Sequence, residues 1–193
     1  MVDHVTAVYK SCFFQLRQLR LIRSCLTMDS AKSLVHGFIS SRLDYCTSLL
    51  VGAADRVIRK LQEVQNAAAG LIIGTHKFDH ITPILRDLHW LPVHQRIKYK
   101  IAMLVNKCLR GLAPPYLAEL FQPVVELAGR RHLRSAASDK LSVQRTATTI
   151  DRSNFAVSGT DIWNSLPTDL RLSSLSTATF ARHRKTHLFC STE

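Results

Sequence analysis

The sequence predicts an all-α protein, and two observations lead to that expectation. Apolar residues recur at spacings of three and four along most of the first 121 residues, as on one buried face of an α-helix. Glycine and proline stand between these runs, where helices begin and end. A short hairpin around residues 141–149 is the one non-helical element that we expect besides loops. No period of about 20 to 50 residues repeats, so the helices are not those of a solenoid.

The first predicted helix carries a single apolar stripe. This stripe consists of Val5, Val8, Cys12, Leu16, Leu19 and Ile22. A second helix follows over residues 31–39, with Asp29 and Ser30 as its expected N-cap, and residues 41–50 continue or re-enter it. A third helix covers residues 57–71. Gly74 is its expected terminator, because glycine readily adopts the left-handed conformation of a helix C-cap.

Residues 79–101 have the sequence DHITPILRDLHWLPVHQRIKYKI and contain two X-Pro steps. Thr82 is interpreted as an N-cap followed by Pro83 at the first helical position, and the Leu-Pro step at Pro92 repeats this arrangement. The stretch therefore predicts two proline-started helices, with Trp90 between them as a packing anchor. The second of these helices is expected to end at Gly111.

The composition changes after residue 121. Residues 122–154 are polar and rich in Ser, Thr, Ala and Arg, which favours a loop. A short helix that ends in a proline turn is expected over residues 155–167, and Ser176 is the expected N-cap of a last helix. We therefore predict a basic helical array over residues 1–121 and a less regular basic segment with a final helix over residues 122–193.

The chain is strongly basic. It has 26 Lys and Arg against 14 Asp and Glu, a formal net charge of +12 and a pI of about 10.0. A surplus of this size attracts polyanions, most often nucleic acid. Residues 51–110 hold ten Lys and Arg against four Asp and Glu, so we expect the contacts to a nucleic-acid backbone to come from there. The expected contact residues are Arg56, Arg59, Lys60, Arg96, Lys98, Lys100, Lys107 and Arg110. The alternative is an ordinary solvated helix face.

Histidines gather in and beside the same stretch, and zinc accepts such ligands. They are His76, His80, His89 and His94. His76 and His80 have the i, i+4 spacing of one helix face, but Gly74 before them and Pro83 after them indicate a loop. No Cys-x-x-Cys or His-Glu-x-x-His motif accompanies them. The pattern favours surface or capping histidines, so we predict no metal and no cofactor, with a metal-dependent hydrolase as the alternative.

The sequence offers little that indicates catalysis. It has no Gly-x-Ser-x-Gly motif, no Walker loop and no glycine-rich dinucleotide turn. Carboxylates are few and no two are adjacent, whereas polymerases and two-metal nucleases need clustered aspartates to hold ions about 4 Å apart. We therefore predict no catalytic residues. Trp90 and Trp163, each shortly before a Leu-Pro step, are interpreted as core anchors, with base stacking as the alternative.

Cysteine usage and hydropathy bear on the compartment. The cysteines are odd in number and widely spaced, which is typical of a reducing compartment. They are Cys12, Cys25, Cys46, Cys108 and Cys190. The longest apolar runs are far shorter than the ~20 residues that span a bilayer, and the N-terminal segment does not resemble a signal peptide. We expect an intracellular protein of the cytoplasm, the nucleus or both, without a membrane partner.

Seven motifs occur along the chain in an order that is itself informative. They are SCFFQLRQLRLIR, LVHGFISSRLDYCTSLL, LQEVQNAAAGLIIGT, HITPILRDLHWLPVHQRIKYKI, GLAPPYLAEL, IWNSLPTDLR and FARHRKTHLF. In this order they resemble the C-terminal part of the reverse-transcriptase (ORF2-type) protein of LINE-type, non-LTR retrotransposons. The resemblance covers nearly the whole chain.

The resemblance implies which partners the chain binds and which catalytic domains it lacks. In that family an endonuclease domain comes first, followed by a polymerase domain with a catalytic Tyr/Phe-x-Asp-Asp motif, and no position here matches that motif. We expect a non-catalytic fragment whose partners are RNA, DNA or both, and the polymerase domain of the parent protein. The family sequence runs on upstream of Met1, so we expect a truncated element copy or a start at an internal methionine. The alternatives are a helical interaction module that docks on the missing polymerase domain, and a non-functional element remnant.

Overall fold

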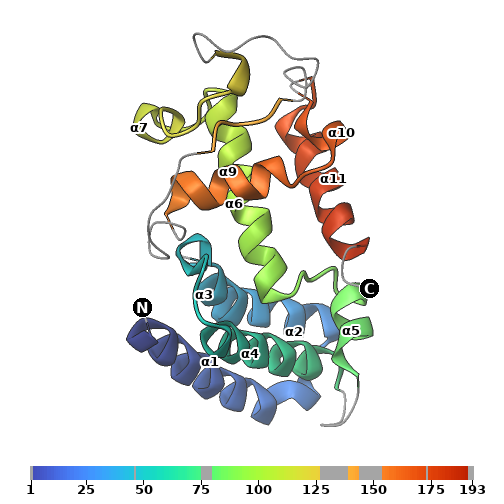
Figure 1. Ribbon diagram of the computed structural model, residues 1–193. Coiled ribbons are helices and arrows are strands. Elements are labelled where there is room, and N and C mark those ends of the chain that lie inside the picture. Colours follow the sequence, from blue (N-terminus) through green and yellow to red (C-terminus); the bar gives the residue numbers. More distant parts are fainter. Residues whose placement is uncertain are drawn as a thin grey trace. The chain divides into compact units, whose positions relative to one another are not determined.

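The computed structural model describes residues 2–45, 47–74, 80–126, 139–143, 154–172 and 174–190. The chain forms two compact units, unit 1 (Met1–Arg96) and unit 2 (Ile97–Glu193). The described parts of both units consist of helices and connecting turns, with an isolated antiparallel bridge between Pro123 and Leu141 and no strand (Figure 1). The predicted all-α class is therefore confirmed.

The described helices of each unit have the following bounds. Those of unit 1 are α1 (Val2–Ile22), η1 (Arg23–Cys25), α2 (Met28–Val35), η2 (His36–Ser40), α3 (Ser41–Asp44), η3 (Thr47–Leu50), α4 (Asp55–Ile73), α5 (Ile81–Asp87) and the first turn of α6 (Val93–Leu109). Those of unit 2 are the rest of α6, α7 (Pro115–Ala118), η4 (Val124–Glu126), α9 (Phe155–Asn164), α10 (Thr168–Arg171) and α11 (Thr177–Cys190).

The core of unit 1 forms where α1 packs along α4, and these helices lie side by side in Figure 1. Cys12 and Leu16 of α1 are buried, as are Leu61 and Val64 of α4. Because burying one such aliphatic side chain contributes about 1.5–3 kcal/mol, the two apolar stripes stabilise the unit strongly. The predicted α1 stripe is correct in its middle, but Ile22 is exposed because the helix ends there.

Helix α2 begins at Met28, three residues before the expected start at residue 31. Its N-cap is Thr27, whose hydroxyl oxygen accepts a hydrogen bond from the backbone N–H of Ser30 at 3.2 Å. The prediction of Asp29 and Ser30 as the cap is therefore wrong. Asp29 lies in the first turn instead, where its negative charge faces the positive end of the helix dipole. The helix then continues through the π-helical turn η2 into α3, as the sequence indicated.

The two helices of the proline-rich stretch also begin elsewhere than predicted. His80 is the N-cap residue of α5, so Pro83 is the third helical residue and Thr82 is not a cap. Pro83 is still tolerated, because N–H groups of a first turn have no acceptor within the helix. Pro92 immediately precedes α6, and its carbonyl oxygen accepts from Arg96 N–H at 2.8 Å. Trp90 between the helices is partly buried and is not among the fully buried residues of the core.

Two glutamines of α4 hold this stretch in place. Gln65 is fully buried, and its Nε2 donates to the carbonyl oxygen of Leu91 at 2.9 Å. The side-chain oxygen of Gln62 accepts from the backbone N–H of Val93, the first residue of α6, at 2.8 Å. The turn between α5 and α6 is therefore fixed by side chains that lie about thirty positions earlier in the sequence, a relationship that local patterns do not reveal.

In unit 2, α6 ends as predicted at Gly111. This glycine has a φ of +66°, and the N–H of Leu112 bonds to the carbonyl of Lys107 at 2.9 Å while Gly111 N–H bonds to Cys108 at 3.1 Å. That pair of bonds is the Schellman arrangement, which supplies partners to carbonyls at the helix end.

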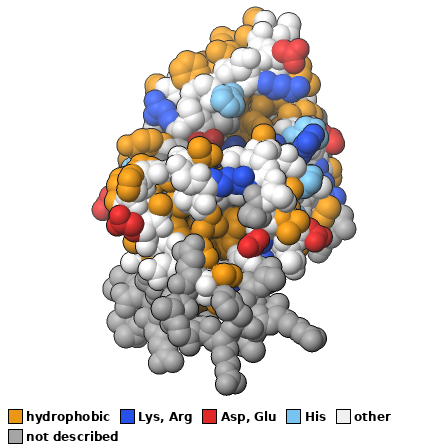
Figure 2. Space-filling model, turned by 90° about the horizontal axis from the view of Figure 1, so that it is seen from above, with side chains coloured by type: hydrophobic (Ala, Val, Ile, Leu, Met, Phe, Trp, Pro, Cys, Tyr) orange, Lys and Arg blue, Asp and Glu red, His pale blue; other side chains and the backbone are white. Residues whose placement is uncertain are grey.

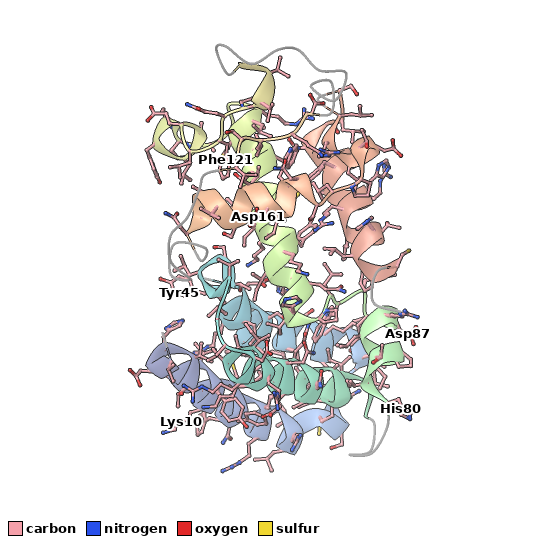
Figure 3. The ribbon with its side chains drawn as sticks, viewed as in Figure 1. Lys10, Tyr45, His80, Asp87, Phe121 and Asp161 are labelled. Carbon is pink, nitrogen blue, oxygen red and sulfur yellow. The ribbon has the colours of Figure 1, made fainter. Side chains whose placement is uncertain are left out.

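Close packing of α9 on α6 forms the centre of unit 2. A Cβ atom at Gly159 would lie 2.9 Å from the ring of Phe121 and 3.0 Å from Val105 of α6, so only glycine permits this approach. Phe121, labelled in Figure 3, meets Phe155 of α9 edge to face with ring centroids 5.3 Å apart. Trp163 of α9 is buried, so its prediction as a core anchor is confirmed.

Residues 139–143 run alongside residues 122–124. The N–H of Val124 bonds to the carbonyl of Lys140, and the N–H of Ser142 bonds to the carbonyl of Gln122, each at 2.9 Å. The rest of the hairpin expected over residues 141–149 falls outside the described residues. The last helix, α11, has the predicted cap, since Ser176 Oγ accepts from the N–H of Thr179 at 3.1 Å.

The compact units do not divide where the composition changes. The composition changes at residues 121 and 122, whereas the units meet at residues 96 and 97, within α6. Beyond its first turn, α6 places Ile97, Ile101 and Val105 in buried positions of unit 2. Composition does not show this division, because it falls within a single continuous helix.

Candidate nucleic-acid interface

The eight predicted contact residues differ in exposure and fall in both units. Arg56, Arg59, Lys98 and Lys107 are exposed, whereas Lys60, Lys100, Arg96 and Arg110 are half-buried. The set therefore contains a group of three on α4 in unit 1, a group of four on α6 in unit 2, and Arg96, which lies in the first turn of α6 and belongs to unit 1.

The α4 group is compact. Arg56, Arg59 and Lys60 are spaced by three and four residues, so they project from one side of the helix. Asp55, in the first turn, is exposed beside them and offsets one positive charge. This group is the part of the predicted set that the structure brings together in unit 1.

Two contacts fix how α1 lies along α4. The hydroxyl of Tyr9 donates to the carboxylate of Glu63 at 3.1 Å, and Arg23, just after α1, donates to the carbonyl of Leu71 at 2.8 Å. The helices therefore run in the same direction. Arg20 lies about three turns after Tyr9, and Arg56 about two turns before Glu63, so both arginines are on the side where the two helices meet.

Sequence reasoning did not place Arg17 and Arg20 in the site. Both are exposed on α1, and Arg20 lies on the side of α1 that carries Tyr9, whose hydroxyl contacts Glu63 of α4. We call Arg17, Arg20, Arg56, Arg59 and Lys60 the α1–α4 basic surface. At 1.5 Å per residue it extends over about 27 Å along the helices. The sequence showed these arginines beside the apolar stripe of α1, but not which helix α1 packs against.

Arg96 has a role within the fold. Its Nε lies 3.2 Å from the carboxylate of Asp44 at the end of α3, and the side chains are 18% and 34% exposed. This ion pair joins the first turn of α6 to α3 inside unit 1. An arginine held in this way is less accessible to a phosphate than those of the α1–α4 basic surface.

The α6 group of unit 2 is spread around its helix. Lys100, Lys107 and Arg110 share one side, since seven and three residues are close to whole turns, and Lys98 projects from another. On the face shown in Figure 2, Lys and Arg side chains are separated from one another by hydrophobic, uncharged and acidic ones. The four basic residues of α6 in unit 2 thus lie on more than one side of the helix.

Neither the histidines nor the cysteines form a metal site in the described chain. His80, His89 and His94 are exposed, and His76 falls outside the described residues. Among the residues that the structure describes, no group of three or more His, Cys, Asp or Glu is placed to hold a metal ion. Burial raises the pKa of the thiols of Cys12 and Cys108 and so keeps them protonated.

Within the described ranges, no helix combines the length and the apolar character that crossing a membrane requires. Comparisons with protein-family models, curated proteins and solved structures give no significant match.

Proposed function

We propose that this chain is a non-catalytic C-terminal region of a non-LTR retrotransposon RNA-directed DNA polymerase and that it binds RNA or DNA along the phosphate backbone. The order of the seven sequence motifs supports the family origin. The α1–α4 basic surface is the observation that carries the binding activity.

The geometry of this surface suits a phosphate backbone. Five positive side chains spread over about 27 Å parallel the backbone of a nucleic-acid segment, and each phosphate contact releases a counterion. The one carboxylate in the middle of the surface, Glu63, accepts a hydrogen bond from Tyr9. Because charged contacts to phosphates carry no sequence information, binding is expected to tolerate many sequences.

Two double variants test this proposal with equal changes of charge. Arg20→Gln with Arg56→Gln removes two charges from the α1–α4 basic surface, and Lys32→Gln with Arg86→Gln removes two exposed charges from α2 and α5. The first pair should weaken binding to single-stranded RNA and to duplex DNA by about tenfold or more, and the second by much less. Equal losses in both pairs would show that only net charge matters and would overturn the assignment of this surface.

A separate observation supports a second candidate function, a protein-interaction module. Phe14 and Leu21 are 58% and 74% exposed on α1, two turns apart and on a different side of the helix from Tyr9. Contiguous exposed apolar patches mark protein contacts, and in this alternative Phe14 and Leu21 form part of one on α1. In this alternative α1 docks on the polymerase domain of the parent protein, and the isolated chain self-associates. Sizing chromatography that shows a monomer at high concentration counts against it.

A further inference from the structure

Unit 2 contains a pocket of about 200 Å³ between α6, α9 and α10. Asn106 and Leu109 of α6, Trp163 of α9 and Arg171 of α10 contribute to its walls. A cavity of about 150 Å³ accepts a benzene molecule, so this pocket has room for a ligand of about one ring with a small substituent.

Arg171 is the most unusual group in the pocket. The residue is only 6% exposed, and its Nε and Nη1 are buried without a hydrogen-bond partner among the described residues. A buried guanidinium is costly unless an anion pairs with it. Its planar fork of N–H groups fits the paired oxygens of a carboxylate or a phosphate.

Asn106 adds a second unsatisfied group. It is 3% exposed, and its Oδ1 is buried without a partner among the described residues. Since buried polar atoms in folded proteins nearly always have partners, two such side chains lining one pocket indicate that a polar ligand belongs there. The Asn106 carboxamide would accept an N–H or O–H of that ligand while Arg171 donates to its oxyanion.

Part of the remaining wall is apolar, and hydrogen bonds fix its position. Trp163 donates its indole N–H to the carbonyl of Asp139 at 2.9 Å, which fixes the orientation of its ring. Asn164 bonds to both the N–H and the carbonyl of Leu141 at 2.9 Å, which ties the segment that contains Asp139 to α9. The Trp163 ring and Leu109 supply apolar surface for a flat group.

The charged side chains on the pocket walls are those of Arg171, Arg110 and, among the described residues, one carboxylate, Asp139. The buried guanidinium of Arg171 is the group with which an anion would pair. Replacing Asp139 by asparagine would remove the opposing charge and so strengthen the binding of an anion.

We propose that this pocket binds a small oxyanion, a phosphate or a carboxylate, that carries a flat or apolar group of about one ring. The oxyanion pairs with Arg171, the apolar part lies against Trp163 and Leu109, and a donor of the ligand bonds to Asn106. The site lies in unit 2 and does not depend on the α1–α4 basic surface. The oxyanion comes either from a free small molecule or from the terminal phosphate of a nucleic-acid strand.

Calorimetric titration of the full chain with phenyl phosphate, benzoate and inorganic phosphate tests the pocket. Phenyl phosphate or benzoate should bind saturably, and inorganic phosphate more weakly because it leaves the apolar walls empty. Arg171→Met should weaken binding at least tenfold, since it removes charge-assisted hydrogen bonds. It keeps the side-chain volume and removes a buried charge, so the variant should be at least as stable as the natural chain. Arg182→Gln, which removes an exposed charge from α11, should bind as the natural chain does.

A second comparison separates the two sources of the oxyanion. A short oligonucleotide with a 5′-phosphate and the same strand with a 5′-hydroxyl are titrated in the natural chain and in Arg171→Met. A preference for the phosphorylated strand that disappears in Arg171→Met assigns the pocket to strand ends, and phenyl phosphate or benzoate binding without that preference assigns it to free small anions. Asp139→Asn should tighten binding in either case. The proposal is overturned if phenyl phosphate, benzoate and the phosphorylated strand all fail to bind at millimolar concentration, or if Arg171→Met binds them as well as the natural chain.

Discussion

Arg23 donates from Nε to the carbonyl oxygen of Leu71 at 2.8 Å, and this bond joins the end of α1 to the end of α4. The same guanidinium reaches the carbonyls of Ile72 at 2.7 Å and Leu26 at 3.0 Å. Carbonyls in the last turn of a helix have no partner within it, and they attract positive charge. Arg23 thereby supplies hydrogen-bond donors to two carbonyl groups at the end of α4 and aligns α4 with α1. The α1–α4 basic surface depends on this arrangement.

Replacing Arg23 by alanine should destabilise unit 1. Three charge-assisted bonds are lost and two carbonyls of α4 lose a partner, so the free energy of unfolding should fall by on the order of 2 kcal/mol. Arg20→Ala is the matched control because Arg20 is exposed on the same helix, and it should change stability by less than about 0.5 kcal/mol. Urea unfolding measures both, and equal effects would contradict the role of Arg23.

Replacing Gln65 by leucine should also destabilise unit 1, although leucine has a similar size. The carbonyl of Leu91 would lose the bond from Gln65 and remain buried, at a cost of about 1–3 kcal/mol. The change is measured as a shift of the urea midpoint. A Gln65→Leu variant as stable as the natural chain would mean that water or another group already satisfies the Leu91 carbonyl.

Two glycine-to-alanine variants should have opposite effects. Gly159→Ala forces a methyl group against Phe121 and Val105, so we expect a loss of about 1–3 kcal/mol in the free energy of unfolding. Gly37→Ala, in the helical turn η2, meets nothing within 4 Å and should be neutral or stabilising by up to about 1 kcal/mol. Thermal unfolding distinguishes them. A tolerated Gly159→Ala would show that α9 does not pack on α6 as closely as described.

The features that the sequence predicted correctly are local ones. Gly74, Gly111 and Ser176 end or begin helices through contacts within a few residues, so their chemistry is visible in the sequence. The two proline steps were misplaced by one or two residues, because a first turn accepts proline at more than one position.

The features that the sequence did not predict depend on contacts between distant segments. Gln65 is a polar residue at a helix position, and only the fold shows that it is buried against Leu91. The burial of Arg171 and Arg184 could not be predicted either, because arginine is usually exposed and both are nearly fully buried in unit 2. Of the candidate interface, the α4 group followed from helical spacing, whereas Arg17 and Arg20 required knowing that α1 packs along α4.

The stability of unit 2 should fall as the pH falls below about 6.5 because of His187. Burial, and to a lesser extent the charge of Arg184, lowers the pKa of His187 from its ordinary value of 6.5. Arg184 Nη1 lies 3.2 Å from His187 Nδ1, and a guanidinium only donates, so Nδ1 accepts and the neutral ring is favoured. Burial also lowers the pKa of Arg184 to about 10, so the guanidinium remains charged in this range.

The direction in which stability changes with pH follows from proton uptake by His187. As the pH falls through 6.5, the unfolded chain binds a proton at His187 that the folded chain resists, so stability is lost on acidification. His187→Gln removes this uptake, and the difference in melting temperature between pH 7.5 and pH 5 should shrink. His183→Gln, at an exposed position of the same helix, is the control. An unchanged pH dependence in His187→Gln would exclude this residue as its source.

The salt dependence of nucleic-acid binding tests the central claim most directly. If the α1–α4 basic surface contacts about three to five phosphates, the logarithm of the association constant should fall with the logarithm of salt concentration with a slope of about −3 to −5 on duplex DNA. The slope should become shallower by about two in the Arg20→Gln and Arg56→Gln double variant. Absence of binding at about 50 mM salt, or an affinity that does not change with salt, would contradict the account.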